Sequence, residues 1–298
     1  MTTTTNLEIV KKAGRIGAEV RGLKLTADID AATFAQIQEA LKEHLVLFFR
    51  GQDHLDDASH EEFAKRFGEL FVHPTVPAKE NTAAIFELDS QHGAKANTWH
   101  TDVTFVPEVP RYSVLRGVEI PSVGGDTVWA NTHTAFTDLP VELQELAEKI
   151  WAIHSNKFDY ASFAYLNAAK SKDAEQYAKY REIFSRFEFE TRHPLVFTHP
   201  ENGKKHLLLG GFIRQFEGYS TAETTSLYEI LQSYVTRLEN TVRWNWQKDD
   251  LVIWDNLASQ HYAIADYDER RVVRRVTVSK NTPTSVNGEA STLISETK

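Results

Sequence analysis

Three side chains of this chain could bind one metal ion. His100 and Asp102 lie two positions apart, and His261 follows far downstream. Two histidines and one carboxylate can occupy one face of a ferrous ion and leave the opposite face open for reaction. On a strand, side chains at positions i and i+2 point to the same side, so His100 and Asp102 could reach one ion while Thr101 points away. We therefore predict an iron site that is completed by His261, with zinc as the alternative metal for the same donors.

The same His-x-Asp spacing occurs a second time, in His54-Leu55-Asp56. That pair lies in a polar stretch, residues 51–62, directly before a predicted helix, which is typical of a solvated loop. The first pair is flanked by Trp99, Val103 and Phe105, a pattern typical of the end of a half-buried strand. We expect the first pair to bind the metal and the second to be structural.

Two arginines near the C-terminus could bind anions. If residues 270–278 form a strand, Arg271 and Arg275 share one face and Arg274 shows the other. An arginine inside a barrel needs an anion, and its planar fork suits a carboxylate or a sulfate. Two interpretations stay open: two anion-binding arginines inside a barrel, or surface charges on an edge strand.

Two further positions could contribute to a site. Gly124-Gly125-Asp126-Thr127 predicts a tight turn that places Thr127 at the start of a barrel strand, although a plain hairpin turn with an exposed threonine fits as well. His73 follows the second predicted helix, where a lone histidine is more often structural than functional. The remaining histidines have no spacing that predicts a second metal site.

The composition limits the class of protein. The chain has 298 residues, 41% of them hydrophobic and 25% charged, which fits a globular protein of one large or two small domains. A net charge of −9 disfavours nucleic-acid or anionic-membrane surfaces. With no cysteine, disulfides, zinc–thiolate sites and iron–sulfur clusters are excluded. No apolar leader or 18-residue apolar stretch is evident, so we expect a cytoplasmic enzyme.

The pattern of elements indicates what positions these residues. Asp30 would cap a helix that ends near Leu45, residues 46–49 would form a buried strand, and a second helix would begin at Ser59 and end at Gly68. Further short strands are predicted at 113–119, 127–130, 241–246, 251–254 and 272–279, and helices at 141–151, 173–184 and 222–239.

The last of these helices carries an apolar stripe that we interpret as core packing, made of Leu227, Ile230, Leu231, Tyr234 and Leu238. Residues 281–298 are polar and predicted to be frayed. The order of elements favours a mainly β fold with α additions: a double-stranded β-helix, or jelly roll, with helical insertions.

Taken together, several motifs resemble one known family. They are Gly14-Arg15-Ile16-Gly17-Ala18-Glu19, Phe48-Phe49-Arg50-Gly51, Trp99-His100-Thr101-Asp102-Val103-Thr104-Phe105, Gly124-Gly125-Asp126-Thr127, Trp254-Asp255-Asn256 and Gln260-His261-Tyr262. This set resembles the taurine dioxygenase-like (TauD/TfdA) family of Fe(II)- and 2-oxoglutarate-dependent dioxygenases. The resemblance covers nearly the whole chain and implies a single domain over residues 1–298.

Within the family, three stretches are similar to the bacterial alkylsulfatase branch. These are Val128-Trp129-Ala130-Asn131-Thr132, His154-Ser155-Asn156 with Asp159-Tyr160-Ala161-Ser162, and Arg237-Leu238-Glu239-Asn240-Thr241-Val242-Arg243-Trp244.

The resemblance implies a role for each candidate residue. His100, Asp102 and His261 would bind Fe(II). Thr127 and Arg271 would bind 2-oxoglutarate. His73, Arg275 and the backbone N–H of Val103 would hold the sulfur oxyanion of the substrate. Relatives also suggest a lid at residues 155–185 and a homodimer or homotetramer. Phe163 is one candidate for a contact to the substrate tail.

The chain departs from the family pattern at two places. The segment from His261 to Arg271 is one residue shorter than the family leads us to expect, and the difference falls in the turn at 267–269, where a change of length is tolerated. Ala96 stands where taurine-specific members carry an asparagine that contacts the substrate amine. This difference favours a substrate with an apolar tail over taurine.

The activity implied is hydroxylation of the carbon next to the sulfate of an alkyl sulfate ester. An aldehyde and inorganic sulfate would leave, with succinate and CO2 as co-products and O2 as oxidant. Taurine or another alkanesulfonate, releasing sulfite, and an aryloxyalkanoate are alternative substrates of the same chemistry. Outside this class, a zinc hydrolase and a metal-stabilised binding protein remain alternatives.

Overall fold

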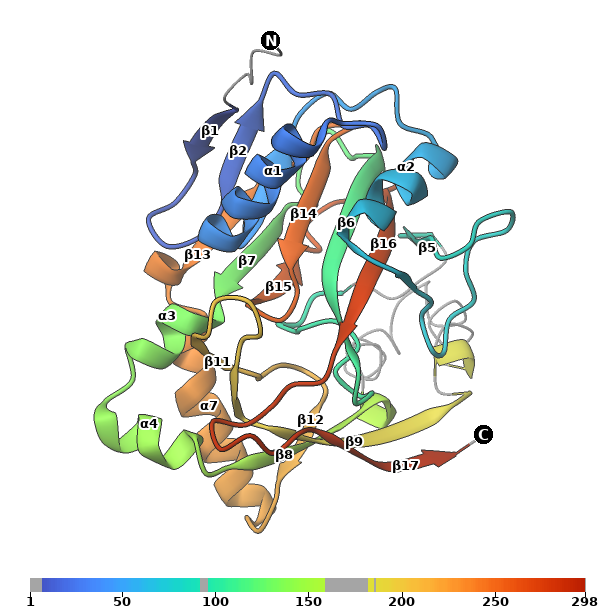
Figure 1. Cartoon of the computed structure of the whole chain (residues 1–298). Coiled ribbons are helices and arrows are strands. Elements are labelled where there is room, and N and C mark those ends of the chain that lie inside the picture. The colour runs from blue at the N-terminus through green and yellow to red at the C-terminus, as the bar shows by residue number, and fades with distance from the viewer. Residues whose placement is uncertain (1–6, 92–95, 159–181, 185, 298) are drawn as a thin grey trace.

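Two β-sheets pack against each other at the centre of the protein (Figure 1). The structure is a computed structural model, and it describes residues 7–91, 96–158, 182–184 and 186–297. The larger sheet has the order β1-β2-β3-β14-β6-β16-β4, with β5 beside β16, and the smaller has the order β13-β7-β15. The strands of the larger sheet are β1 (Glu8–Lys11), β2 (Ala18–Arg21), β3 (Val46–Phe49), β4 (Leu70–Phe71), β5 (Phe86–Asp89), β6 (Val109–Glu119), β14 (Leu251–Asp255) and β16 (Val272–Asn281). Those of the smaller sheet are β7 (Thr127–Asn131), β13 (Thr241–Trp244) and β15 (Ser259–Ala263). The predicted mainly β fold with a two-sheet core is confirmed.

Helices and two small sheets surround this core. The helices are α1 (Ala31–His44), α2 (Asp57–Ala64), α3 (Thr132–Thr137), α4 (Val141–Ala147) and α7 (Thr221–Val235), with the short 3-10 turns η1 (Lys65–Phe67), η2 (Asn156–Phe158) and η3 (Leu238–Asn240). One small sheet has the order β12-β8-β9-β17, from β8 (Trp151–Ser155), β9 (Glu188–Pro194), β12 (Ile213–Phe216) and β17 (Thr292–Thr297); the other pairs β10 (Val196–Thr198) with β11 (Lys205–Leu207).

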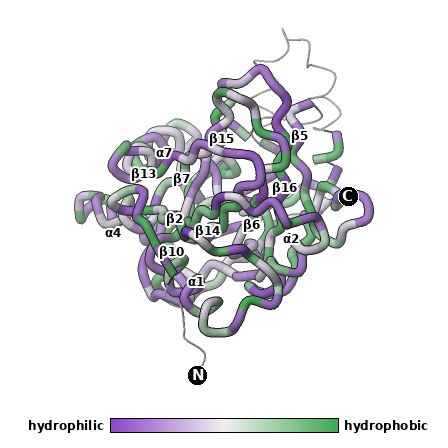
Figure 2. The backbone as a smooth tube through the Cα atoms, turned by 90° about the horizontal axis from the view of Figure 1, so that it is seen from above, coloured by the Kyte–Doolittle hydropathy of each residue, from purple (hydrophilic) through white to green (hydrophobic). Residues whose placement is uncertain are grey.

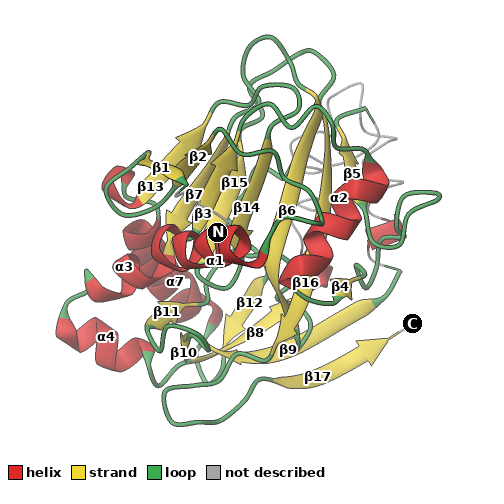
Figure 3. Ribbon diagram, turned by 45° about the horizontal axis from the view of Figure 1, so that its top comes forward, coloured by secondary structure: helices red, strands yellow, loops and turns green. Residues whose placement is uncertain are grey.

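Strand β3 shows why the larger sheet is buried on both faces. Its four residues are all apolar and all fully buried. Leu47 and Phe49 pack with α1 and α2, which lie across the outer face of the sheet (Figure 3). Val46 and Phe48 point the other way, into the space between the sheets. An uninterrupted apolar run therefore forms a strand with two buried faces rather than an alternating one.

Aromatic side chains fill the space between the two sheets. Phe48 stacks on Trp244 with ring centroids 4.3 Å apart, and it meets Trp129 edge-on at 5.6 Å. Trp129 in turn contacts Trp254 at 5.7 Å. Offset and edge-to-face contacts of this kind add to the free energy of burial. This core joins β3, β7, β13 and β14 and fixes the ends of the strands that carry the candidate site.

The N-cap of the second helix lies three residues earlier than predicted. Asp56 is its N-cap and accepts a hydrogen bond from the Ser59 N–H at 2.8 Å, and the Ser59 hydroxyl accepts from the Asp56 N–H. Ser59 therefore occupies the last position of a capping box, three residues after the N-cap, rather than its first position. The predicted end at Gly68 is confirmed, since η1 extends the helix to that residue. The first helix begins after Asp30 as predicted.

The predicted frayed tail is wrong. β17 pairs antiparallel with β9 over five residue pairs, and Ser291, just before it, is buried. A polar sequence can form an edge strand because its backbone groups are satisfied by the neighbouring strand, whatever its side chains.

Two other predicted helices differ from the structure. The helix predicted at 141–151 ends at Ala147, because Trp151 begins β8. In the stripe of α7, Leu231 is buried, but Ile230 is 44% and Leu238 85% exposed. α7 ends at Val235, so Leu238 no longer follows the helical period. The helix at 173–184, the lid at 155–185 and Phe163 lie largely or wholly outside the described residues.

Hydrophilic residues interrupt the hydrophobic stretches of the backbone at short intervals (Figure 2). Among the helices that the structure describes, none has the length and apolar character needed to cross a bilayer.

Candidate active site

His100, Asp102 and His261 meet at one point. One ligand atom from each lies within 4.8 Å of the others, and all three residues are buried. His100 and His261 face each other across an antiparallel bridge: the His100 N–H donates to the His261 carbonyl at 3.1 Å, and the His261 N–H donates back at 2.8 Å. Direct pairing of the two chain segments brings these distant histidines together.

The segment that carries His100 and Asp102 is not the strand predicted from sequence. Only His100 is paired, and residues 102–105 form a turn. Val103 has φ +58°, in the left-handed region, which ends the extended backbone after Asp102. For a β-branched residue this conformation is a true outlier and costs on the order of 1–3 kcal/mol. The two ligands thus converge through a bridge and a turn rather than through strand alternation.

The protonation states of the three residues suit a divalent cation. His100 donates its Nδ1–H to the Thr98 carbonyl at 2.7 Å, which places the lone pair of the ring on Nε2, 3.6 Å from Asp102 Oδ1. Burial lowers the pKa of His261 well below its usual value and keeps the ring neutral. Burial alone would raise the pKa of Asp102, but the charge of Arg275 holds it well below the usual range. One carboxylate and two imidazoles fit ferrous iron.

Arg275 lies beside the cluster rather than on the surface. It is 7% exposed, its Nη1 donates to Asp102 Oδ1, and its Nε has no partner within the described residues. Ser113 donates to the second carboxylate oxygen of Asp102 at 3.3 Å. A buried guanidinium with an unpaired N–H can accept an anion in addition to Asp102.

Arg271 is also buried, at 7% exposure, and burial lowers its pKa. Its Nε donates to the Gly125 carbonyl at 3.0 Å, and among the described residues it forms no ion pair. Arg274 shows the opposite face and pairs with Asp57 and Glu87. Since β16 lies inside the larger sheet, the edge-strand interpretation of these arginines is wrong.

Thr127 begins β7, as the sequence predicted, and follows a turn in which Gly124 and Gly125 both have positive φ. It is 3% exposed, which excludes the interpretation as an exposed hairpin residue. The Trp246 Nε1–H donates to the Thr127 hydroxyl oxygen at 3.0 Å. Because that oxygen already accepts one hydrogen bond, its own O–H is directed elsewhere. Trp246 is a contributor that sequence reasoning missed, since it lies more than a hundred residues from Thr127.

His73 is partly buried and neutral. Its Nδ1 accepts from the backbone N–H groups of Thr75 and Val76, at 3.3 and 3.1 Å, so the proton resides on Nε2. Burial, together with the charge of Arg275, lowers the pKa of His73 to about 3. The ring packs 5.3 Å from the Phe86 ring.

Apolar side chains surround His73 and Val103. The buried members of this cluster are Phe71, Val103, Phe105, Val106, Phe184, Phe189 and Phe212, and Val76, Ala96 and Phe187 pack against it. Such a wall suits an apolar group better than an ammonium group.

Gly210 lies directly behind the metal cluster, and sequence reasoning missed it as well. A Cβ on Gly210 would approach the His100 Cα at 3.0 Å, and its φ is +133°. Only glycine allows the backbone to pack this closely against His100.

The second His-x-Asp pair is structural, as expected. Asp56 caps α2, and His54 Nε2 bonds to the Leu25 carbonyl at 2.8 Å. Within the described residues the only cluster with metal-binding geometry is that of His100, Asp102 and His261.

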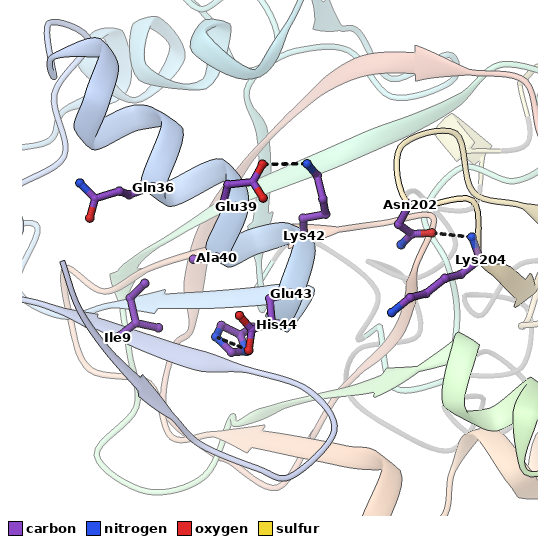
Figure 4. A pocket seen from close by; sticks show the side chains of 9 residues that line it. All are labelled: Ile9, Gln36, Glu39, Ala40, Lys42, Glu43, His44, Asn202 and Lys204. Atoms are coloured by element: carbon purple, nitrogen blue, oxygen red, sulfur yellow. Dashed lines mark hydrogen bonds and ion pairs between the residues drawn. The ribbon is translucent and has the colours of Figure 1, made fainter. Parts of the chain in front are cut away.

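A surface groove between α1 and the β10–β11 loop is unrelated to this cluster (Figure 4). Four of its side chains form two pairs: Glu39 with Lys42 at 2.8 Å and His44 with Glu43 at 3.8 Å. None of the candidate site residues lines it; those that do are Ile9, Gln36, Glu39, Ala40, Lys42, Glu43, His44, Asn202 and Lys204.

Comparison with known proteins gives consistent similarities. The sequence profile of the taurine catabolism dioxygenase TauD, TfdA family matches residues 8–277. An alpha-ketoglutarate-dependent sulfate ester dioxygenase of Pseudomonas putida is 51% identical over 286 residues, covering 96% of this chain and 93% of that protein. An alkylsulfatase of Acinetobacter baylyi is also 51% identical, covering 96% of this chain and 89% of its own length. The crystal structure of a taurine dioxygenase from Burkholderia xenovorans has a TM-score of 0.81 at 30% identity, covering 97% of this chain and 95% of that one.

Proposed function

The chain belongs to the TauD, TfdA family of taurine catabolism dioxygenases, and from this premise we propose that it oxidises alkyl sulfate esters. It is an α-ketoglutarate-dependent dioxygenase, as its relatives are, and uses Fe(II), 2-oxoglutarate and O2. Our proposal concerns its substrate and the residues that carry out each step.

In this proposal His100, Asp102 and His261 hold the iron. The observation in its favour is the donor set itself: two imidazoles and a carboxylate, buried and with their ligand atoms within 4.8 Å of one another. When bound, iron and 2-oxoglutarate supply the oxidising power drawn from dioxygen. The residues of the chain contribute binding, orientation and exclusion of water.

Arg271 and Thr127 bind 2-oxoglutarate. Arg271 lacks an ion pair among the described residues, and its Nε is anchored on the Gly125 carbonyl, so the rest of its fork can pair with a carboxylate. The Thr127 hydroxyl, whose oxygen accepts from Trp246, is set to donate.

Arg275, His73 and the Val103 N–H bind the sulfate group of the substrate. Arg275 has an unpartnered Nε, and His73 offers a neutral Nε2–H donor. The adjoining apolar cluster, to which Ala96 and Phe105 belong, accommodates an alkyl tail. Fixing the sulfate would direct the carbon that bears it toward the metal.

Hydroxylation at that carbon gives a hydroxyalkyl sulfate. This product loses inorganic sulfate as its C–O bond to the sulfate breaks, and an aldehyde remains; 2-oxoglutarate yields succinate and CO2. Taurine or another alkanesulfonate is the second candidate, since an anion pocket of this kind also fits a sulfonate, and an aryloxyalkanoate is the third.

We further propose that the enzyme is a single-domain cytoplasmic protein that works as a homodimer or homotetramer. Its net charge of −9 supports our proposal that it binds neither nucleic acid nor anionic membranes.

The test is oxygen-dependent succinate formation with octyl sulfate, an alkanesulfonate, taurine and a phenoxyacetate in parallel. We expect octyl sulfate to give the highest kcat/KM, with one inorganic sulfate released per succinate. Asp102→Ala serves as the inactive control. If no compound couples succinate formation to its own loss, the substrate class is wrong. If succinate never forms, even with Fe(II), the zinc-hydrolase or binding-protein alternative gains support.

A further inference from the structure

The side chain of Asn256 binds the main chain of Asp102 on both sides. Its Oδ1 accepts from the Asp102 N–H at 2.9 Å, and its Nδ2 donates to the Asp102 carbonyl at 3.1 Å. The same Nδ2 donates to the Pro110 carbonyl at 2.8 Å. Asn256 is fully buried, in the turn between β14 and β15. The side-chain amide of Asn256 thus satisfies the backbone N–H and the backbone carbonyl of Asp102, as a neighbouring strand would. Asp102 is the residue that supplies the carboxylate ligand.

The next residue, Val103, adopts the strained conformation. It is 2% exposed and has φ +58°. No backbone or side-chain acceptor among the described residues receives its N–H. A valine leaves the left-handed region when nothing holds it there, because its branched Cβ clashes with the backbone.

The residue after Val103 is held as well. His154 Nδ1 lies 2.9 Å from the Thr104 hydroxyl, and His193 donates its Nε2–H to the Thr104 carbonyl at 2.7 Å. All three residues are buried. Val103 therefore lies between two neighbours whose polar groups are bound by side chains from other parts of the fold.

Building on the function proposed above, we propose that Asn256 is a positioning residue that keeps Val103 left-handed and Asp102 in place. Through Asp102 it orients the carboxylate that binds iron. Through Val103 it leaves a buried N–H available for the substrate oxyanion. One side chain then sets both metal affinity and substrate affinity, although it touches neither ligand.

Asparagine suits this role because the task needs an acceptor and a donor on one rigid side chain. Alanine provides neither. Aspartate keeps the acceptor for the Asp102 N–H but places a negative oxygen against two carbonyls. With either substitution, Val103 is free to relax toward an extended conformation.

The experiment compares Asn256→Ala in two backgrounds, wild type and Val103→Gly. Glycine adopts positive φ without strain, so in that background the hydrogen bonds of Asn256 are less needed to keep residue 103 in the left-handed conformation. Two quantities are measured: Co(II) affinity by optical titration, and binding of octyl sulfate by anaerobic calorimetry to protein loaded with Fe(II) and 2-oxoglutarate. In the valine background we expect Asn256→Ala to weaken both about ten- to a hundredfold. In the glycine background we expect a much smaller loss.

Asn240→Ala is the matched control. Asn240 is equally buried and its Nδ2 also donates to two main-chain carbonyls, those of Asn131 and Val235. It should lower thermal stability as Asn256→Ala does but leave both affinities unchanged. Equal losses in the valine and glycine backgrounds would overturn the inference, as would a fall in stability without a change in affinity.

Two readouts separate this inference from the proposed function. If wild-type protein does not bind octyl sulfate, the substrate proposal fails, and the Co(II) titration still decides the role of Asn256. If Asn256→Ala fails to fold, Val103→Gly with Asn256→Ser provides the comparison against Asn256→Ser alone.

Discussion

At the scale of single residues, the two arginines Arg271 and Arg275 show how far a sequence argument reaches. The alternation of side chains along a strand predicts that Arg271 and Arg275 lie on one face and Arg274 on the other. It does not predict which face points into the protein. The structure buries both and pairs Arg274 with Asp57 and Glu87. Each buried arginine is then available to a different anion.

We predict that Arg271→Ala raises the KM for 2-oxoglutarate by about tenfold or more, because charge-assisted hydrogen bonds contribute roughly 1.5–3 kcal/mol. Arg275→Ala should raise the KM for the sulfate ester by a similar factor and also weaken Fe(II) binding, since Arg275 contacts Asp102. Steady-state kinetics with each substrate varied in turn distinguish the two. Arg274→Ala is the control and should alter neither KM. Equal loss of both affinities in both variants would contradict this division of roles.

Gly125 gives a second prediction at this scale. Its φ is +72°, and a Cβ there would lie 3.1 Å from Arg271 Cδ and 3.1 Å from Pro121 Cγ. Gly125→Ala should therefore displace Arg271 and raise the KM for 2-oxoglutarate severalfold.

Gly203→Ala is the matched control for this change. Gly203 also has a positive φ, +65°, but nothing lies within 4 Å of its added Cβ. Both variants bear the backbone strain of about 1–2 kcal/mol. A KM for 2-oxoglutarate that is the same in both would show that Arg271 is not held by this turn.

At the scale of elements, the sequence predicts the start of α1 more accurately than the conformation of the segment that carries His100 and Asp102. Asp30 caps α1 as predicted, whereas Asp56 and not Ser59 caps α2. Two predictions at this scale were wrong: the position of the capping box of α2, and the strand at residues 99–105. In each case the local sequence pattern fits two alternative placements of the element. Long-range contacts, such as the bridge between His100 and His261, decide between them.

The cap of α2 provides a test of the second His-x-Asp pair. Asp56→Ala should lower the free energy of unfolding by about 1 kcal/mol, the usual cost of losing an N-cap. Fe(II) affinity should stay unchanged, whereas Asp102→Ala should abolish it. Urea unfolding and metal titration provide the two measurements. Weaker metal binding by the Asp56→Ala protein would mean that the pair is not merely structural.

At the scale of the whole molecule, burying neutral histidines ties stability to pH. Burial lowers the pKa of His60 and of His193 to about 4. In the unfolded chain the same groups titrate near about 6.5. The unfolded state therefore binds protons first as pH falls, so their contribution is complete above about pH 6.5 and is lost progressively toward pH 4. Burial raises the pKa of Asp250 to about 6, which opposes part of this trend.

We predict that the free energy of unfolding falls steeply between pH 6.5 and 4.5, by up to about 1.4 kcal/mol per pH unit for each such histidine. Urea unfolding at a series of pH values measures the slope. His60 lies on α2, away from the candidate site, and bonds to the Val114 carbonyl at 3.1 Å. A His60→Gln variant keeps a hydrogen-bond donor at this position. It should reduce the pH dependence of the free energy of unfolding by the contribution of about one proton. An unchanged pH dependence in this variant would show that His60 is not one of the groups that cause the loss of stability at low pH.

The sequence by itself determined the chemistry and the class of fold. The residue types at 100, 102 and 261 restrict the metal, and the lack of cysteine removes the thiolate alternatives. Apolar runs and helix caps are local signals, so they gave the mainly β core and α1. These properties depend on residue types and on neighbours within a few positions.

Only the tertiary structure decided which residues meet and in what conformation. It paired His100 with His261, placed Trp246 on Thr127, and brought Asn256 to both sides of Asp102. It also held Val103 in a backbone conformation that its own side chain disfavours. No local pattern can predict these features, because the energy that maintains them comes from contacts between segments far apart in the chain.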